Sequence, residues 1–428
     1  MGALADSLSA TLRGLRHRNF RLFFFGQLVS LAGTWMQNLA QGWLVWRLGG
    51  SPWLLGLVGF AQFFPVLLLG LLGGWAADRF DRHRLVMLTQ TASLVQSVVL
   101  AALTLSGAVQ VWHVIVLAAF LGAVNAFDMP ARQAFLVRMV GREDLGNAIA
   151  LNSSIFNGAR IVGPAVAGLV TGLWGEGACF ALNAISFGAV LASLAAMRIE
   201  RERRRSGPGA WHQIREGLAY AWRTPHTRAL LGLVTATSLF GLPYSVLLPA
   251  IAGGVLGTDA RGLGLLMSCA GIGSLAGALS MARRTSLKGL GRHAGLMASL
   301  FGAALTLFAL SERFALSAAL LAVLGFCFMS QMAAVNTLLQ SLVPEALRGR
   351  LMSLYVVTFV GMAPLGSLAM GRLSSRFGVQ DVLFAGGVLT LVTAMAFLAH
   401  LPRVRPSVQV LLDTRAAESS SRLLRNPL

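Results

Sequence analysis

The chain has 428 residues, of which 56% are hydrophobic and only 12% are charged, and its formal net charge is +19. This composition excludes an ordinary soluble globular protein. A large basic excess can also mark a nucleic-acid-binding protein, but no basic domain exists outside the apolar stretches, so we expect no nucleic-acid partner.

Stretches without any Asp, Glu, Lys or Arg follow one another along the chain, and the longest cover 48–77, 85–127, 229–258 and 314–344. A helix that crosses a bilayer needs about 20 mostly apolar residues, and its backbone polar groups must be paired within the helix. We therefore predict an all-α membrane protein with twelve transmembrane helices. The predicted spans are 20–46, 53–76, 85–106, 111–129, 147–174, 178–197, 229–252, 262–282, 293–311, 315–336, 351–374 and 381–400.

The segments between the spans alternate between many and few basic residues. Most of the 35 lysines and arginines precede the first span, follow the last, or lie after spans 2, 4, 6, 8 and 10. Because cytoplasmic loops carry the excess of Lys and Arg, we predict that both termini are cytoplasmic. The basic residues are nearly all arginine, a usage that favours a bacterial source, and we expect a multi-pass protein of the bacterial inner membrane.

The segment 198–228 is long and highly charged, and it divides the spans six plus six. Within it, Trp211, Ile214, Leu218 and Trp222 share one helical face, which favours a short helix in the membrane interface. A surface helix that caps a bundle is the alternative. The predicted domains are a cytoplasmic N-terminus (1–19), an N-terminal six-helix bundle (20–197), the cytoplasmic linker (198–228), a C-terminal six-helix bundle (229–401) and a disordered cytoplasmic tail (402–428).

The two halves share an internal repeat with an offset of about 200 residues. Parallel halves of six spans are one way in which transporters are built, so we predict two pseudo-symmetric six-helix bundles. The matching positions are Leu121-Gly122 with Leu324-Gly325, Glu143 with Glu345, and Pro164 with Pro364.

The loop between spans 2 and 3 carries a glycine, an aspartate and an arginine at fixed offsets. Gly74 allows two helices to approach closely, Asp78 can accept hydrogen bonds from a helix N-terminus, and Arg82 can pair with a carboxylate. The segment resembles the loop signature G-x-x-x-D-R-x-x-R of the major facilitator superfamily, with Arg79 in place and Asp81 where the family usually has glycine. A loop whose arginines only set topology is the alternative.

Spans 4 and 5 extend this resemblance. The segments 125–133 (NAFDMPARQ), 141–152 (GREDLGNAIALN) and 157–168 (NGARIVGPAVAG) look like the branch of the superfamily that contains the enterobactin exporter and macrolide-efflux-like proteins. The resemblance implies a secondary active transporter with a small-molecule substrate, and we expect it to act as a monomer in the lipid bilayer.

The superfamily resemblance also implies a charge cluster that latches the outward-facing state. Mapped onto this sequence, the latch comprises Asp78, Arg82 and Asp128, docked near Arg350 and Leu351 at the start of span 11. An acid at the edge of a span is costly unless it is paired, which favours a role for Asp128. The equivalent positions of the second half are not acidic, so the latch is expected on one side only.

Span 5 contains a group of small residues and a proline that resembles the antiporter motif of the superfamily. Such residues allow close packing of helices, and a proline bends a helix, so we predict a hinge or packing role. Glycine and proline are common in transmembrane helices, which is the alternative explanation. The four residues are Gly158, Gly163, Pro164 and Gly168.

Arg160 is the only lysine or arginine deep inside a predicted span, about 20 Å from the span's start at the rise of an α-helix. A charge at that depth faces a watery cavity or a partner, so we predict that Arg160 binds an anionic substrate or a coupling carboxylate. A structural pair with polar groups of another span is the alternative. Further candidates for substrate contact, each equally compatible with interhelical hydrogen bonding, are Gln37, Gln41, Asn152, Asn157, Tyr244 and Gln331.

The sequence predicts a transporter and not an enzyme. Cys179, Cys269 and Cys327 stand alone in apolar runs, and no Walker loop, zinc spacing or nucleophile elbow occurs. A loose dinucleotide fingerprint at 271–276 lies inside an apolar span without a preceding strand, which favours helix packing, so we expect no cofactor and no metal. The leading hypothesis is export of a small amphipathic or anionic solute, such as a siderophore or a drug, by alternating access, with proton antiport as the expected drive. An importer or a lipid-moving member of the superfamily, and a non-transporting sensor or scaffold, are the alternatives.

Overall fold

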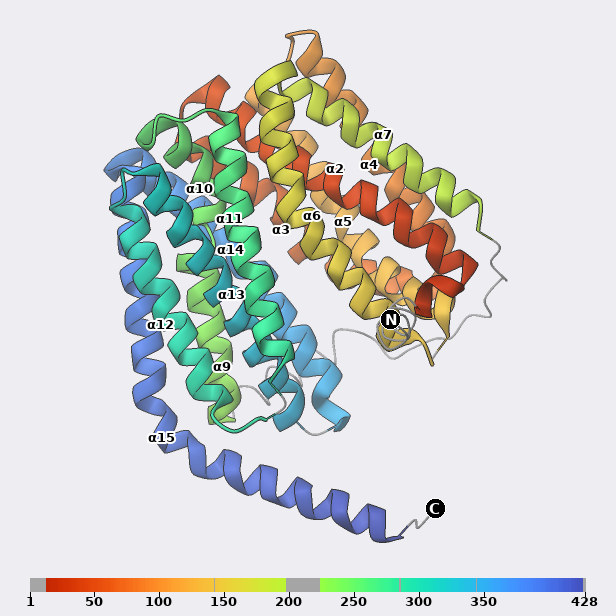
Figure 1. Ribbon diagram of the computed structural model, residues 1–428, viewed down its shortest axis with the longest axis vertical. Coiled ribbons are helices and arrows are strands. Elements are labelled where there is room, and N and C mark those ends of the chain that lie inside the picture. Colours follow the sequence, from red (N-terminus) through yellow and green to blue (C-terminus); the bar gives the residue numbers. More distant parts are fainter. Residues whose placement is uncertain (1–12, 142, 198–223, 285, 344, 426–428) are drawn as a thin grey trace, which may run out of the picture.

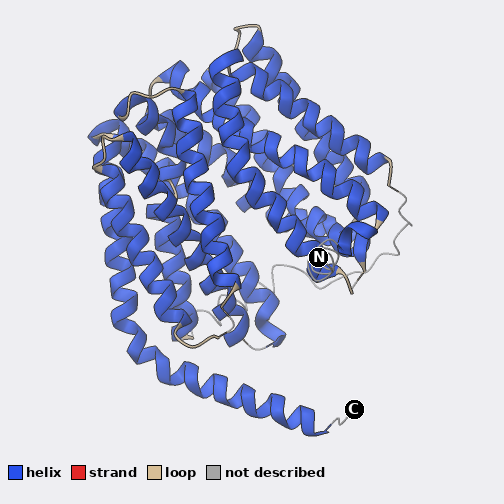
Figure 2. Ribbon diagram, in the orientation of Figure 1, coloured by secondary structure: helices blue, strands red, loops and turns tan. Residues whose placement is uncertain are grey.

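The computed structural model describes residues 13–141, 143–197, 224–284, 286–343 and 345–425, and this part of the chain is helical without any strand (Figure 2). The first half forms six long helices after a short 3-10 helix, η1 (Arg13–Arg16). They are α2 (Arg18–Gly49), α3 (Pro52–Arg79), α4 (Arg82–Leu105), α5 (Val111–Val140), α6 (Leu145–Trp174) and α7 (Glu176–Ala195).

The second half forms six further spans, and the first of them is broken into four parts. Pro243 lies between two of these parts; because proline cannot donate a backbone hydrogen bond, the span departs from the unbroken helix predicted over 229–252. The parts are α9 (Pro225–Ala236), the π-helical η2 (Thr237–Gly241), α10 (Tyr244–Ala250) and the π-helical η3 (Ile251–Val255). The remaining helices are α11 (Ala260–Ala282), α12 (Leu290–Ala309), α13 (Phe314–Leu342), α14 (Glu345–Phe377) and α15 (Val379–Arg425).

Among the described residues, 11 spans are long and apolar enough to cross a membrane. The remaining long helix is α2, which has 32 residues and carries Gln27, Gln37 and Gln41, all of them buried in the N-terminal bundle. Polar side chains inside a bundle pair with neighbouring helices and do not face lipid, so they lower the hydropathy of α2 without preventing it from spanning. The predicted all-α membrane fold is confirmed.

The two bundles repeat the same packing. Helix α3 packs along α5 in the first half, and α11 packs along α13 in the second. A Cβ atom on Gly122 of α5 would collide with the backbone oxygen of Gln62 in α3, and one on Gly325 of α13 would collide with that of Ala270 in α11. These are the glycines of the sequence repeat, so the repeat marks equivalent helix crossings.

The bundles meet at one end and separate toward the other (Figure 1). Two helix pairs make the junction, α3 with α14 and α6 with α11. A Cβ on Gly56 would lie 2.9 Å from the Cα of Gly371, and one on Gly264 would lie 3.1 Å from the Cα of Gly168. We call this the closed end. It is the end predicted to be extracellular.

The opposite end, which carries the loops predicted to be cytoplasmic, is here called the open end. Gly74 near the end of α3 and Gly349 near the start of α14 have no atom within 4 Å of an added Cβ. Neither glycine lies at a helix contact, in line with the separation of the bundles toward this end (Figure 1).

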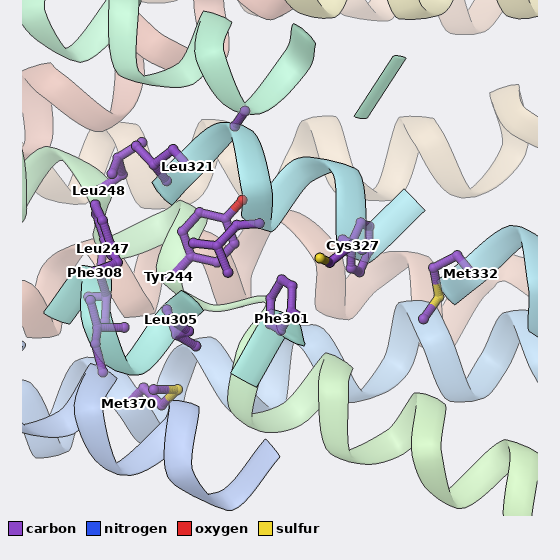
Figure 3. Packing of buried hydrophobic residues seen from close by; sticks show 14 of the residues in the cluster. Tyr244, Leu247, Leu248, Phe301, Leu305, Phe308, Leu321, Cys327, Met332 and Met370 are labelled. Carbon is purple, nitrogen blue, oxygen red and sulfur yellow. The ribbon is translucent and has the colours of Figure 1, made fainter. Parts of the chain in front are cut away.

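The C-terminal bundle is centred on an aromatic core around α10 (Figure 3). The ring of Tyr244 lies 6.2 Å from that of Phe301 and 6.4 Å from that of Phe308, and Leu247 and Cys327 are fully buried. Aromatic pairs at such distances contribute about 0.5–1.5 kcal/mol beyond area burial. This packing holds the broken span in place.

Helix α15 continues beyond its membrane-spanning part, Val379–Pro402, as a helix that bends away from the bundle (Figure 1). This differs from the disordered tail predicted for 402–428. The segment 407–425 contains neither glycine nor proline and is rich in good helix formers, which explains the difference. The predicted interfacial helix of the linker lies in 198–223, outside the described residues.

Candidate functional site

Arg160 of α6 lies at the junction of the two bundles. Its guanidinium carbon is 5.7 Å from the centre of the Trp35 ring of α2, and Trp35 in turn packs edge-on against Phe156 at 6.1 Å. A Cβ on Gly163 would lie 2.6 Å from the Cβ of Trp35, so glycine is needed there for α2 and α6 to approach. Within the described part of the chain, no carboxylate pairs with Arg160.

Tyr244 is the residue of the C-terminal bundle that lies near Arg160. It begins α10 directly after Pro243, and its side chain is only 5% exposed. Arg160 and Tyr244 lie close enough to interact electrostatically, although they are separated by 84 positions and belong to different bundles. The structure therefore brings together two residues that the sequence analysis names independently.

Three of the four predicted hinge residues lie at helix contacts. Gly163 faces α2, and both Pro164 and Gly168 face Gly264 of α11. Gly158 differs, because no atom lies within 4 Å of an added Cβ there. The small residues thus pack α6 against both bundles on the closed side of Arg160, while the hinge itself stays a prediction.

Gln37 is fully enclosed by polar neighbours of its own bundle. Its Nε2 donates to Gln96 at 3.0 Å, while its Oε1 accepts from Ser97 at 2.9 Å and from Asn183 at 2.7 Å. These contacts join α2 to α4 and α7. They favour the interhelical alternative for this residue over substrate contact.

Gln41 and Gln331 also bond to neighbouring helices. Gln41 donates to Gln62 of α3 at 3.4 Å, and Gln331 of α13 donates to Thr237 of η2 at 2.9 Å. Gln331 is fully buried, and its bond fixes the broken span to α13.

The two asparagines of α6 are less constrained. Asn157 donates to the backbone oxygen of Ser153 at 2.8 Å, and its own Oδ1 is buried without a partner. Asn152 is half-buried, and no hydrogen bond to it is found in the described part of the chain. Both lie on the open side of Arg160 along α6, where a solute could reach them.

Asp128 is the centre of a buried polar cluster within the N-terminal bundle. Thr89 donates to its Oδ1 at 2.7 Å and Gln90 at 2.9 Å, while Arg132 forms an ion pair with Oδ2. Arg132 also donates to Gln27 of α2 at 2.7 Å. We call these five residues the Asp128 cluster; it joins α2, α4 and α5.

The position of Asp128 corrects the expectation of an acid at the edge of a span. Helix α5 runs to Val140, and the Asp128 side chain is 1% exposed. Its ion-pair partner is Arg132, one helical turn away, and the sequence analysis did not pair these two residues. The i, i+4 spacing of opposite charges was the available signal.

The loop residues of the predicted latch stand apart from Asp128. Asp78 is exposed and has no hydrogen bond or ion pair among the described residues. Arg79 lies over the Trp75 ring at 5.3 Å, and Arg82 donates to the backbone oxygens of Ala77 and Ala134 at 3.3 and 3.4 Å. The side chain of Arg350, the expected docking partner, lies outside the described residues. Within the described part of the chain, Asp128 bonds to Thr89, Gln90 and Arg132 and to neither Asp78 nor Arg82.

Comparison with curated proteins identifies transporters over most of the chain. The Staphyloferrin A transporter of Staphylococcus aureus is 24% identical over 380 residues, covering 88% of this chain and 95% of the relative. The multidrug efflux pump Tap of Mycolicibacterium fortuitum is 29% identical over 406 residues, covering 90% and 96%. Macrolide efflux protein A of Streptococcus pyogenes is 27% identical over 246 residues, covering 55% and 60%.

Solved structures share the fold. A bacterial homologue of the human lysosomal transporter Spinster, inward-facing and unoccupied, superposes with a TM-score of 0.72 at 15% identity, covering 92% of this chain and 98% of that chain. The nucleoside transporter NupG gives 0.68 at 15% identity, with 90% and 98% covered. The family described as transmembrane secretion effector matches residues 9–419. The chain belongs to this family, within the major facilitator superfamily of membrane transporters.

Proposed function

We propose that the protein is a secondary active exporter of small amphipathic or anionic solutes, a siderophore or a drug, and that it works by alternating access. The observation that carries the proposal is the position of Arg160, a cation without an acidic partner in the described residues, at the junction of the two bundles. A solute that enters from the open end would meet this charge before the closed end stops it.

The surroundings of Arg160 favour a solute with an apolar part as well as a negative charge. Phe156 is 44% exposed beside Trp35, and the Trp35 ring centre lies 5.7 Å from the guanidinium carbon of Arg160. Binding sites for small molecules combine such aromatic walls with few polar anchors. The relatives named for staphyloferrin A, multidrug and macrolide transport support solutes of this size, and two of the three names support efflux.

Proton antiport is the drive that we propose, with Asp128 as the proton-carrying group. Among the described residues it is the buried carboxylate deepest within a membrane-spanning helix, the other buried acid being Glu176 at the start of α7. Protonation would neutralise Asp128 and release Arg132, and the freed charge would alter how α5 holds α2 and α4.

The latch is part of the same proposal. When the open end closes, Asp78 and Arg82 of the loop after α3 would come against the start of α14 near Leu351. Asp78 is exposed and unbonded here, as we expect of a group that forms its bonds only when the open end is closed. Both termini would lie in the cytoplasm, at the bacterial inner membrane.

The test is flux in inverted membrane vesicles, with a carboxylated fluorophore as the anionic probe and its methyl ester as the neutral one. We expect uptake of the carboxylate into the vesicles, and loss of that uptake in Arg160→Gln with partial recovery in Arg160→Lys. Arg292→Gln, which changes an exposed arginine at the start of α12, is the matched control.

Other outcomes would change the conclusion. Uptake in right-side-out vesicles would indicate an importer. Equal loss of both probes would remove the role of Arg160 in recognising charge, and unchanged flux in every variant would favour a sensor or scaffold.

A further inference from the structure

A groove of about 640 Å³ lies between α3, α4 and α5 of the N-terminal bundle. It exists because α3 and α4 both pack on α5 but hardly on each other, so α5 forms the floor between them. Small side chains at Ala92 and Ala123 leave the space open. The other residues that line it are Ala76, Phe80, Asp81, Arg84, Leu85, Leu88, Thr89, Phe120, Val124 and Phe127.

The groove is apolar along its length and polar at one end only. Its walls are mainly aromatic and aliphatic, while Asp81 and Arg84 lie together where α4 begins, at the open end. This arrangement matches an amphiphile, whose long apolar part ends in one polar head.

Arg84 is the residue at that end whose side-chain hydrogen-bond donors are unused. Asp81 caps α4 by accepting from the backbone N–H of Arg84 at 2.9 Å, and Thr89 donates to Asp128 at 2.7 Å. The guanidinium of Arg84 is exposed and has no hydrogen bond or ion pair among the described residues. Asp81 keeps its negative charge beside Arg84, and the Arg84 guanidinium is the one cationic donor among the described residues that line the groove.

The rim of the groove has the character of a membrane interface. Trp75 is 51% exposed and carries Arg79 over its ring, while Phe80 and Leu88 are 52% and 67% exposed. Tryptophan and basic residues gather where a protein crosses the headgroup layer, and large apolar side chains stay exposed where lipid covers them. These features favour a groove that opens to the cytoplasmic leaflet.

We propose that the groove binds an anionic phospholipid of the cytoplasmic leaflet. One acyl chain lies on α5 between Leu88 and Phe127, and the phosphate pairs with Arg84, with Arg79 near enough on the rim to add positive potential. Basic pockets between transmembrane helices on the cytoplasmic side bind such headgroups. The site is separate from Arg160, so it does not depend on the proposed export function.

The second bundle does not repeat the site. The corresponding cavity between α11, α12 and α13 has a volume of about 310 Å³, roughly half as large, and its Arg284 already donates to the backbone oxygen of Lys288 at 3.0 Å. We therefore expect the lipid in the N-terminal bundle only.

The experiment uses the full-length protein in phosphatidylcholine vesicles that contain a small fraction of phosphatidylglycerol with a diazirine on one acyl chain. A parallel sample carries the same acyl chain on phosphatidylcholine. After irradiation, the labelled residues are mapped by mass spectrometry. We expect labelling at Leu88, Phe120 and Phe127, with phosphatidylglycerol clearly preferred over phosphatidylcholine.

Variants separate the headgroup from the acyl chain. Arg84→Gln is expected to lower the preference for phosphatidylglycerol about fivefold, the effect of one basic residue near an anionic lipid. Arg84→Lys should keep the preference, and Arg292→Gln, at the same third position of its own helix α12, should not change it. Ala92→Trp fills the groove and should reduce labelling by both lipids.

The proposal is overturned if the two lipids label the groove equally in the unmodified protein, or if labelling is spread evenly over the outer helices. It is also overturned if Arg84→Gln and Arg292→Gln behave alike. Because Arg84 is exposed, its variants leave the fold intact, so a poorly folded Ala92→Trp would not weaken the test.

Discussion

The closed end and the open end of the junction between the bundles are built from different types of residue. At the closed end, glycines bring backbones together, as Gly56 does with Gly371 and Gly168 with Gly264. At the open end, Asp78 and Arg79 are exposed, and neither Gly74 of α3 nor Gly349 of α14 lies at a helix contact. Glycine packing gives a seal that depends on shape, whereas charges could pair and separate in the movement of the bundles that we propose.

A third arrangement lies within the N-terminal bundle, near its open end. The Asp128 cluster uses charge as the open end does, but buries it. The difference from Asp78 is solvent: an exposed aspartate without a partner costs little, while a buried one is tolerated only with its bonds complete. The comparison predicts that removing a buried charge lowers the stability of a bundle, whereas removing an exposed charge shifts the balance between states with little loss of stability.

The largest expected effect comes from Asp128→Ala. This change leaves Arg132 without its ion-pair partner, and breaking a buried pair costs about 3–5 kcal/mol. We expect a large drop in thermal stability in detergent, measured by loss of monodisperse protein after heating. Arg79→Ala, which removes an exposed charge of the neighbouring loop, is the control. Equal stability of the two variants would contradict the distinction between buried and exposed charge.

The closed end is tested by Gly56→Ala. The new methyl group would meet the backbone of Ser367 and Gly371, and overpacking of this kind costs about 1–3 kcal/mol. We expect the closed end to open more often and transport to fall about tenfold, measured as flux with the carboxylated probe. Gly188→Ala in α7, where no atom lies within 4 Å of the added Cβ, is the matched control and should transport normally.

A smaller effect is expected for Asp78→Asn. An exposed aspartate without bonds contributes nothing to this state, so stability should not change. If Asp78 pairs only when the open end closes, its loss shifts the balance by about 1 kcal/mol toward the state described here. Spin labels on α3 and α14 at the open end should report fewer short distances under transport conditions. An unchanged distribution would remove Asp78 from the latch.

The smallest effect concerns the ion pairs that tie η1 to α6. A hydrogen bond from His17, together with the charges of Arg13 and His17, lowers the pKa of Asp144 below its usual value. A lowered carboxyl pKa means that the attachment is complete above the ordinary pKa of aspartate and is lost as the pH falls through the lowered value. Hydrogen exchange of residues 13–17 should therefore rise in acid, and Asp144→Asn should remove this pH dependence.

Much of the fold follows from the distribution of charge. Runs without charged residues give the spans because the bilayer excludes charge, and the repeated Leu-Gly pairs mark equivalent crossings in the two bundles. The break in the seventh span was not predicted, because a proline such as Pro243 is also found in transmembrane helices that stay continuous. Its consequences depend on the aromatic core around Tyr244.

The site was predictable in part. Arg160 can be identified from sequence because a charge inside a span is rare. Its neighbour Trp35 cannot, because the contact between α2 and α6 depends on tertiary packing. Gln37 has the same sequence signal as a cavity residue, yet it bonds to α4 and α7. Periodicity places a polar residue on a helix but does not tell which neighbour that face meets.

The central claim is that the two bundles must separate at the closed end for a solute to leave. The hydroxyl oxygens of Ser51 and Ser375 lie 3.5 Å apart there, one at the start of α3 and one near the end of α14. With Cys179, Cys269 and Cys327 replaced by serine, a disulfide between Ser51→Cys and Ser375→Cys should stop flux of the carboxylated probe, and a reductant should restore it. Full flux with the disulfide intact would contradict the account.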